Sequence, residues 1–175
     1  MKRKPVYLIA LTAVLAALTT VAIFYLRVPF ANGWLHAGDV VILLAAVLLP
    51  TPYAMVVGAL GGSMANILGT AFIWAPATAI IKALITVPFS AKQEKLITKR
   101  NLVMIAPYAA ITIVGYGLYQ WMLISMGALP APDGAWAAVS FNLFGDVIQV
   151  LGNATLFVAL AAVLDKTKFK QRIGL

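Results

Sequence analysis

The sequence has 175 residues, of which 63% are hydrophobic and only 10% are charged, and its mean hydropathy is +0.98. A soluble domain carries about 25% charged residues, so this composition excludes the soluble class and indicates an integral membrane protein. The sequence contains no cysteine and a single histidine, which excludes disulfides, thiolate metal sites and a histidine-based metal centre.

The net charge of +8 is distributed as membrane topology requires, and not as a nucleic-acid-binding face. All but two of the basic residues lie in three clusters: Lys2, Arg3 and Lys4; Lys92, Lys95, Lys99 and Arg100; and Lys166, Lys168, Lys170 and Arg172. Such clusters mark cytoplasmic segments under the positive-inside rule. We therefore expect both termini of a plasma-membrane protein in the cytoplasm, and no nucleic-acid partner. Arg27 and Lys82 are the two exceptions.

Apolar stretches predict an all-α fold with six membrane-spanning helices in a single domain over residues 1–175. A spanning helix needs about 20 apolar residues. The expected helices are 6–26, 38–49, 53–68, 74–91, 102–126 and 136–164. Six crossings return the chain to the side on which it began, which agrees with the basic clusters. At about 1.5 Å per residue the second helix is shorter than a bilayer, or its ends are buried in protein.

The first helix places Ala13 and Ala17 one turn apart. Small residues at this spacing let two membrane helices approach closely. The face therefore either docks a partner helix or packs inside the domain. Because the chain has no energy source of its own, the first alternative is favoured.

The stretch from Asn32 to Pro50 carries a polar loop directly into an apolar helix, as expected of a lid over a ligand pocket. The loop contains Trp34 and His36, and the helix opens with the carboxylate of Asp39. Asp39 is suited equally to capping the helix N-terminus and to contacting a ligand. His36 is placed to hydrogen-bond either Asp39 or a ligand.

The third and fourth helices carry a packing signal and a polar face. Gly58 and Gly62 form a GxxxG pattern, which allows close helix packing. Trp74, Thr78 and Lys82 recur every four residues and therefore share one face of the fourth helix. Lys82 lies about 12 Å below the outer end of that helix. An ionisable group at membrane depth indicates a functional site.

The last two helices also present polar faces. Tyr116 and Gln120 share a face of the fifth helix, and a stripe of the sixth helix carries Asn142, Asp146, Gln149 and Asn153. Four polar groups aimed one way indicate a cavity wall. Hydrogen bonding between helices is the alternative, and it suits Asn153.

Lys82 and Asp146 lie at matching depth, so they can face one cavity. They can form a structural ion pair, contact a ligand, or pair only when the site is empty. A flat ring could stack on aromatic residues such as Trp34 and Trp74 while its polar edge meets Lys82, Asp146 or Asn142.

The sequence does not predict an enzyme. GALGGSMAN has no lysine and has no hydroxyl at the position that a phosphate-binding loop requires, and neither HExxH nor GxSxG occurs. Five acidic residues leave little scope for a metal site, and no cofactor is expected. A self-sufficient proton-coupled carrier that uses Asp146 is an alternative to a binding subunit, although short helices without a repeat are poorly suited to alternating access.

The run GWLHAGDVVILLAAVLLPTPYAMVVGALGGSMANILG, continuing through APATAIIKAL, resembles the substrate-binding S components of energy-coupling factor (ECF) vitamin transporters. The similarity covers most of the chain. It is closest to the riboflavin-type branch in Gly38-Asp39, in the glycine-rich third helix, and in the pattern formed by Pro76, Thr78 and Lys82.

The resemblance implies a six-helix S-component bundle with an outward-facing pocket under the first external loop. It also implies that Ala13 and Ala17 dock against a membrane coupling subunit, the T component, and that two separate cytoplasmic ATPases drive transport. The pocket looks most like those for hydroxymethylpyrimidine or vitamin B6 pyridines, with riboflavin as the alternative. The expected ligand-binding residues are Trp34, His36, Asp39, Trp74, Thr78, Lys82, Tyr116, Gln120, Asn142, Asp146 and Gln149.

Overall fold

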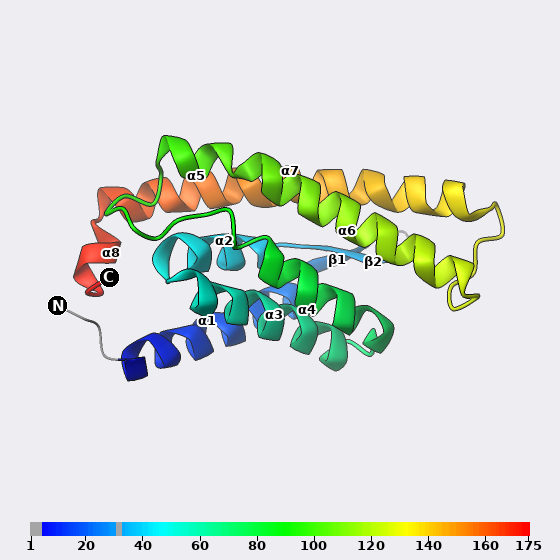
Figure 1. Ribbon diagram of the computed structural model, residues 1–175, viewed down its shortest axis with the longest axis horizontal. Coiled ribbons are helices and arrows are strands. Elements are labelled where there is room, and N and C mark those ends of the chain that lie inside the picture. The colour runs from blue at the N-terminus through cyan, green and yellow to red at the C-terminus, as the bar shows by residue number, and fades with distance from the viewer. Residues whose placement is uncertain (1–4, 31–32) are drawn as a thin grey trace.

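A computed structural model describes residues 5–30 and 33–175 (Figure 1). The basic cluster Lys2, Arg3 and Lys4, and Asn32 of the polar loop, lie outside these residues. The α-helices of the described chain are α1 Pro5–Tyr25, α2 Gly38–Leu48, α3 Thr51–Leu68, α4 Ala75–Leu84, α5 Lys99–Val103, α6 Ile105–Ser125, α7 Ala135–Lys166 and α8 Phe169–Arg172. A 3-10 turn, η1, spans Phe72–Trp74, and two strands span β1 Arg27–Phe30 and β2 Gly33–His36.

The helices form two layers with α2 between them (Figure 1). The first layer holds α1, α3 and α4, and the second holds α6 and α7. The described residues include three apolar helical stretches long enough to cross a membrane, Pro5–Tyr25, Lys99–Ser125 and Ala135–Lys166. The all-α membrane fold class is therefore confirmed.

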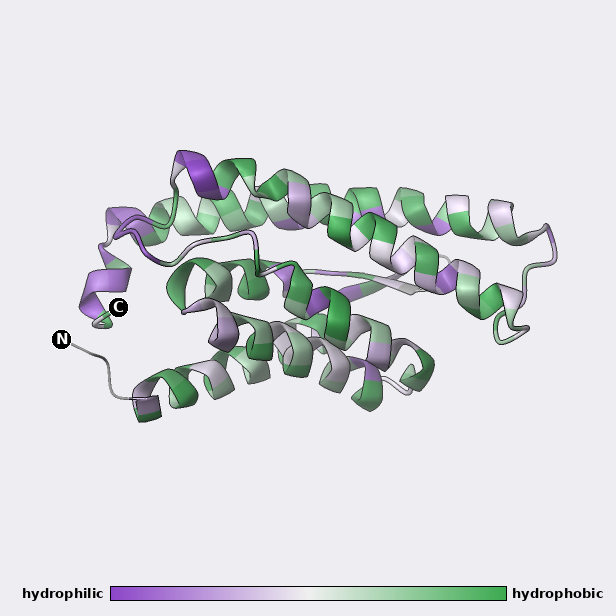
Figure 2. Cartoon of the chain, in the orientation of Figure 1, coloured by the Kyte–Doolittle hydropathy of each residue, from purple (hydrophilic) through white to green (hydrophobic). Residues whose placement is uncertain are grey.

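The two ends of the molecule differ in polarity. The beginning of α1, α5, α8 and the C-terminus gather at one end, whereas the α3–α4 and α6–α7 connections lie at the other (Figure 1). Hydrophilic residues concentrate at the first end, over α5 and α8 (Figure 2). Two of the three basic clusters lie there, so we call it the cytoplasmic end and the opposite end the outer end.

Two expected helices are interrupted by proline. The helix expected over 74–91 ends at Leu84 and continues only as turns, because Pro88 disfavours helical backbone at the residue before it. The helix expected over 102–126 is divided at Met104 into α5 and α6. Pro107 lacks an N–H group and its ring conflicts with the carbonyl one turn earlier, which accounts for the break.

Glycines of α3 bring the first layer together. A Cβ atom at Gly61 would lie 2.6 Å from the Cβ of Thr19 on α1, and one at Gly58 would overlap the carbonyl of Lys82 on α4. The hydroxyl of Thr20 also donates a hydrogen bond to the Gly61 carbonyl at 3.1 Å. The GxxxG pattern therefore packs against α4 through Gly58, while Gly61 allows α1 to approach from the other side.

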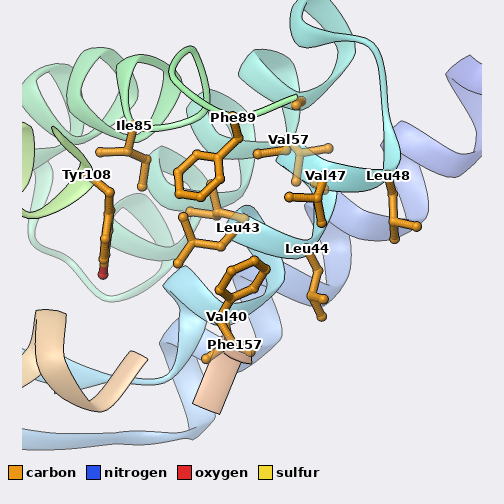
Figure 3. Close-up of a cluster of buried hydrophobic side chains, with 14 of the residues drawn as sticks. Val40, Leu43, Leu44, Val47, Leu48, Val57, Ile85, Phe89, Tyr108 and Phe157 are labelled. Carbon is orange, nitrogen blue, oxygen red and sulfur yellow. The ribbon is translucent and has the colours of Figure 1, made fainter. Parts of the chain in front are cut away.

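The hydrophobic core surrounds α2, whose residues are almost all buried. Side chains from α3, α6, α7 and the segment after α4 converge on this short helix (Figure 3). Phe89 and Phe157 meet edge to face with ring centres 6.1 Å apart. Because α2 is covered by protein on all sides, it needs neither the length nor the lipid contact of a spanning helix.

The polar loop between α1 and α2 contains a hairpin that the sequence analysis did not predict. Strand β1 pairs antiparallel with β2, so that Arg27 lies opposite His36 and Phe30 opposite Gly33. The hairpin runs between the two helical layers (Figure 1).

Candidate ligand-binding site

A cavity of about 160 Å³ lies beside the hairpin, between the two layers. One water molecule requires about 10–15 Å³ of such space, so the cavity has room for an organic ring. The cavity is lined by Ile23, Arg27, Phe30, Trp34, Leu35, His36, Gly62, Asn66, Ala71, Trp74, Thr78, Tyr116, Gln120, Asn142, Gly145, Asp146 and Gln149. Nine of the eleven residues expected to bind ligand are among them; Asp39 and Lys82 are not.

The hairpin is held to α7 at two points. The His36 backbone N–H donates to the Gln149 side-chain carbonyl at 3.1 Å, and the Asn153 amide donates to the His36 carbonyl at 2.9 Å. Near the other end of the hairpin, Phe30 stacks on Phe141 with ring centres 5.4 Å apart and packs against Gly145. The stripe predicted on α7 is therefore divided: Gln149 and Asn153 fix the hairpin, whereas Asn142 and Asp146 face the cavity.

Thr78 organises the wall contributed by α4. Its hydroxyl oxygen accepts hydrogen bonds from the Asn66 amide at 2.7 Å and from the Tyr116 hydroxyl at 3.1 Å. The ring of Trp74 lies beside that of Tyr116, with centres 6.3 Å apart. Helices α3, α4 and α6 therefore present a connected polar and aromatic surface to the cavity.

Lys82 pairs with Asp39 and not with Asp146, so the alternative of a structural Lys82–Asp146 ion pair is wrong. Lys82 Nζ lies 2.7 Å from Asp39 Oδ1 and 2.8 Å from Oδ2, and both side chains are fully buried. The Tyr108 hydroxyl donates to Asp39 Oδ2 at 3.1 Å. The sequence does not indicate this arrangement, because the position of Asp39 at the start of an apolar helix suits a helix cap or a ligand contact.

Asp39 does not cap α2 either. The N-cap residue is Ala37, with no side-chain hydrogen bond, and Asp39 lies within the first turn. Its carboxylate is directed to Lys82 and Tyr108, so the charge of Lys82 is neutralised beneath the cavity. The two residues join the start of α2 to α4 and α6.

Asp146 lines the cavity without a protein partner in the described part of the chain. No hydrogen bond or ion pair reaches its carboxylate from residues 5–30 or 33–175. A carboxylate at membrane depth is costly to leave unpaired and marks a functional position. The chemistry that complements it is a cation or an N–H or O–H donor.

Arg27, Phe30 and Asn66 line the cavity but were absent from the predicted site. A signal for Arg27 was present in the sequence, because it is a basic residue in a loop that the positive-inside rule places outside the cell. Phe30 and Asn66 carry no comparable signal, since their place in the wall depends on the hairpin and on the packing of α3.

His36 is half-buried in the cavity wall, and its Nδ1 accepts a hydrogen bond from the Gly38 N–H at 3.3 Å. Burial lowers the pKa of His36 from 6.5 to about 4, against the opposing effect of the nearby Asp39 charge. The imidazole is therefore neutral at physiological pH. No group of three or more metal-ligating residues occurs in the described chain.

The small-residue face of α1 points outward. Ala13 and Ala17 are exposed, whereas Leu8, Thr12, Ala16 and Thr19 are among the residues that α1 buries against its neighbours. The alternative that Ala13 and Ala17 pack inside the domain is therefore wrong.

Residues 4–166 match the family model described as ECF-type riboflavin transporter, S component. The comparison with curated proteins finds no match. The family match spans nearly the whole chain and agrees with the membrane fold and the outward cavity. The chain therefore belongs to the ECF S components, the vitamin-binding subunits of ECF importers in the plasma membrane.

Proposed function

We propose that the cavity beneath the hairpin binds a single-ring vitamin or vitamin precursor, either hydroxymethylpyrimidine or a vitamin B6 pyridine. The observation that carries this proposal is the carboxylate of Asp146, which lines the cavity without a partner among the described residues. Both candidate rings offer a nitrogen-bound hydrogen that a carboxylate can accept, from an amino group or from a protonated ring nitrogen.

The aromatic residues supply the apolar part of the site. Trp34 lies on the hairpin and Trp74 is the last residue of η1, directly before α4, and both line the cavity. A flat ring stacks on such side chains, while Asn142 and Gln120 offer amide groups to its edge. Asp39 and Lys82 act as positioning residues, because the paired Lys82 lies with its Nζ 5.2 Å from the ring centre of Tyr116, which lines the cavity.

Mass spectrometry of small molecules extracted from the purified protein tests the proposal directly. We expect hydroxymethylpyrimidine or a B6 pyridine to be released on denaturation. The same compound is expected to bind to the ligand-free protein with a Kd well below about 1 mM. Titrations followed by tryptophan fluorescence measure that affinity, since two tryptophans line the cavity. Absence of binding for every compound in a vitamin panel would contradict a binding function for the cavity.

Riboflavin is the second candidate, and the description of the matching family favours it. Its ring edge presents an N–H group between two carbonyl oxygens, which also suits a carboxylate. Recovery of riboflavin in the extraction, with no binding of the single-ring compounds, would replace the first candidate with this one.

For transport we propose that the chain docks on a T component, which two cytoplasmic ATPases drive. Ala13 and Ala17 form an exposed face of small residues in the bilayer-spanning α1, suited to close helix contact. Ala13→Trp is expected to abolish co-purification with the T component and to leave ligand affinity unchanged. Leu18→Trp is a matched control, because Leu18 is also exposed but lies on a different face of α1.

Vesicle uptake separates this proposal from a self-sufficient proton-coupled carrier. A binding subunit alone is expected to give no concentrative uptake into liposomes under a proton gradient. Concentrative uptake that is lost in Asp146→Asn would instead establish the carrier.

A further inference from the structure

Arg27 is a cation of the cavity wall whose position is fixed by packing. Its guanidinium carbon lies 4.2 Å from the ring centre of Trp34 and 4.7 Å from that of Phe24. A Cβ atom at Gly69 would lie 2.8 Å from Nη1, so the guanidinium packs directly against the end of α3. These contacts hold Arg27 on the side of the first layer.

The guanidinium of Arg27 lies over two aromatic rings, and neither ring offers its N–H groups an oxygen acceptor. A guanidinium stacks through its faces and donates hydrogen bonds in its plane. Within residues 5–30 and 33–175 no oxygen accepts a hydrogen bond from Arg27, and no carboxylate pairs with it. Packing therefore holds the guanidinium of Arg27 in the cavity wall, while its N–H donors have no acceptor among these residues.

Asp146 provides the opposite charge from the other layer. It belongs to α7, whereas Arg27 is packed against α3, and both line the same cavity. No ion pair joins them in the described structure. Two unpaired charges of opposite sign on two walls are complementary to a ligand that has an acceptor on one edge and a donor on another.

We propose that Arg27 determines ligand specificity by donating a hydrogen bond to an oxygen atom attached directly to the ligand ring, while a nitrogen-bound hydrogen of the same ring system faces Asp146. This inference rests on the proposed function and narrows it. Pyridoxine carries a ring hydroxyl and a protonatable ring nitrogen, and riboflavin carries ring carbonyls beside an N–H group. Hydroxymethylpyrimidine has no oxygen on the ring itself, and it therefore satisfies Asp146 but not Arg27.

The test is a titration of pyridoxine, riboflavin and hydroxymethylpyrimidine into the purified full-length chain. The variants are Arg27→Gln, Arg27→Lys, Asp146→Asn and the control Arg100→Gln, which removes the same charge from an exposed position on α5. We expect the wild type to bind pyridoxine or riboflavin more tightly than hydroxymethylpyrimidine. Arg27→Gln is expected to weaken binding of that preferred ligand about tenfold or more, with hydroxymethylpyrimidine unaffected.

The remaining variants separate recognition from folding. Asp146→Asn is expected to weaken the binding of all three compounds, and Arg100→Gln is expected to leave the binding of all three unchanged. If Arg27→Gln does not fold, Arg27→Lys serves in its place, because it retains the charge without the planar donors. Arg27→Lys is expected to reduce the ratio by which the protein prefers pyridoxine or riboflavin over hydroxymethylpyrimidine. An equal loss for all compounds in the Arg27 variants would overturn the inference, because it would show that Arg27 only shapes the hairpin.

The outcomes also distinguish the inference from the proposed function. If the wild type prefers hydroxymethylpyrimidine, Arg27 does not select a ring oxygen, and the inference fails while vitamin binding stands. If the wild type binds none of the three compounds, the proposed function and the inference fail together.

Discussion

The outer and cytoplasmic halves of the molecule differ in whether charged side chains such as Asp146 and Asp165 have partners within the protein. Asp146, in the outer half, lines a cavity and has no partner among the described residues. Asp165, at the cytoplasmic end of the same helix, accepts hydrogen bonds from the backbone N–H groups of Leu96 and Ile97 at 2.8 and 2.9 Å. One carboxylate faces a cavity, and the other fixes a loop.

The basic residues show the same contrast. Arg27 lines the outer cavity without a hydrogen-bond acceptor in the part of the chain that the structure describes, whereas Lys170 is buried and donates to the carbonyls of Val47, Ala91 and Gln93. Asp165 and Lys170 are therefore hydrogen-bonded within the protein, whereas Asp146 and Arg27 have no polar partner among the described residues. Unpaired ionisable groups that line a cavity at membrane depth indicate a functional position.

Lys82→Met is the strongest way to break the comparison, because Lys82 lies at the boundary between the halves. It leaves the buried charge of Asp39 without its counter-ion, and such losses cost about 3–5 kcal/mol. We expect a large fall in the thermal unfolding temperature of the detergent-solubilised protein, followed by tryptophan fluorescence. The double variant Asp39→Asn with Lys82→Met removes both charges and is expected to recover much of the loss.

A normal unfolding temperature for Lys82→Met, with ligand affinity lost, would contradict this expectation. It would return Lys82 to the direct ligand contact that the sequence analysis proposed.

Lys170→Met tests the buried hydrogen bonds of the cytoplasmic half alone. The change leaves the carbonyls of Val47, Ala91 and Gln93 without a charged donor, and hydrogen bonds to a charged group contribute about 1.5–3 kcal/mol. We expect unfolding at a lower temperature and unchanged ligand affinity. Lys166→Met, at an exposed position of α7, is the matched control and is expected to change neither. An affinity loss in folded Lys170→Met protein would show that the two halves are coupled.

The sequence predicted the cavity residues of the outer half better than the buried polar contacts of the cytoplasmic half, for a physical reason. Hydropathy and the basic clusters located the helices, and helical periodicity placed Thr78, Tyr116 and Asp146 on inward faces, because these signals are local. Lys170 occurs in a cluster that the positive-inside rule explains completely, so nothing in the sequence distinguished a buried lysine from exposed neighbours.

The pairing of Asp39 with Lys82 was out of reach for a different reason. Matching depth along two helices made Asp146 one possible partner of Lys82, but depth does not specify which helix faces which. The packing of buried α2 between the layers brings Asp39 to Lys82 and Tyr108. The same limit applies to Arg27, whose position depends on a hairpin of four-residue strands.

Gly58→Ala, compared with Gly152→Ala, sharpens the contrast within the helices. A Cβ atom at Gly58 would overlap the Lys82 carbonyl, whereas one at Gly152 meets nothing within 4 Å. Forcing an extra methyl group into close packing costs about 1–3 kcal/mol, while alanine in an open helical position gains up to about 1 kcal/mol. We therefore expect opposite shifts of the unfolding temperature. A lower unfolding temperature in both variants would show that close helix packing is not the reason why Gly58 is required.

Titration of His36 gives the smallest expected effect and reports on the hairpin. The pKa of His36 is lowered by burial to about 4 from 6.5, so between these pH values the unfolded chain binds the proton more readily than the folded one. Stability that depends on neutral His36 is therefore complete above pH 6.5 and is lost as the pH falls toward 4. Because His36 is half-buried, we expect a loss of about 1 kcal/mol, or about 2–4 °C in the unfolding temperature.

The comparison variant for this titration is His36→Gln, which cannot be protonated in this range. Acidic residues that titrate in both proteins cancel when the two pH profiles are subtracted, so the difference isolates the imidazole. Protonated Nδ1 can no longer accept the hydrogen bond from the Gly38 N–H, so the loss should begin where the hairpin joins α2. Hydrogen exchange of the β2 amides is expected to accelerate below pH 6 more in the wild type than in His36→Gln, after correction for intrinsic exchange. Equal pH profiles for the two proteins would mean that the hairpin tolerates a charged His36. The position of the hairpin beside the cavity would then depend on its hydrogen bonds to Gln149 and Asn153 instead.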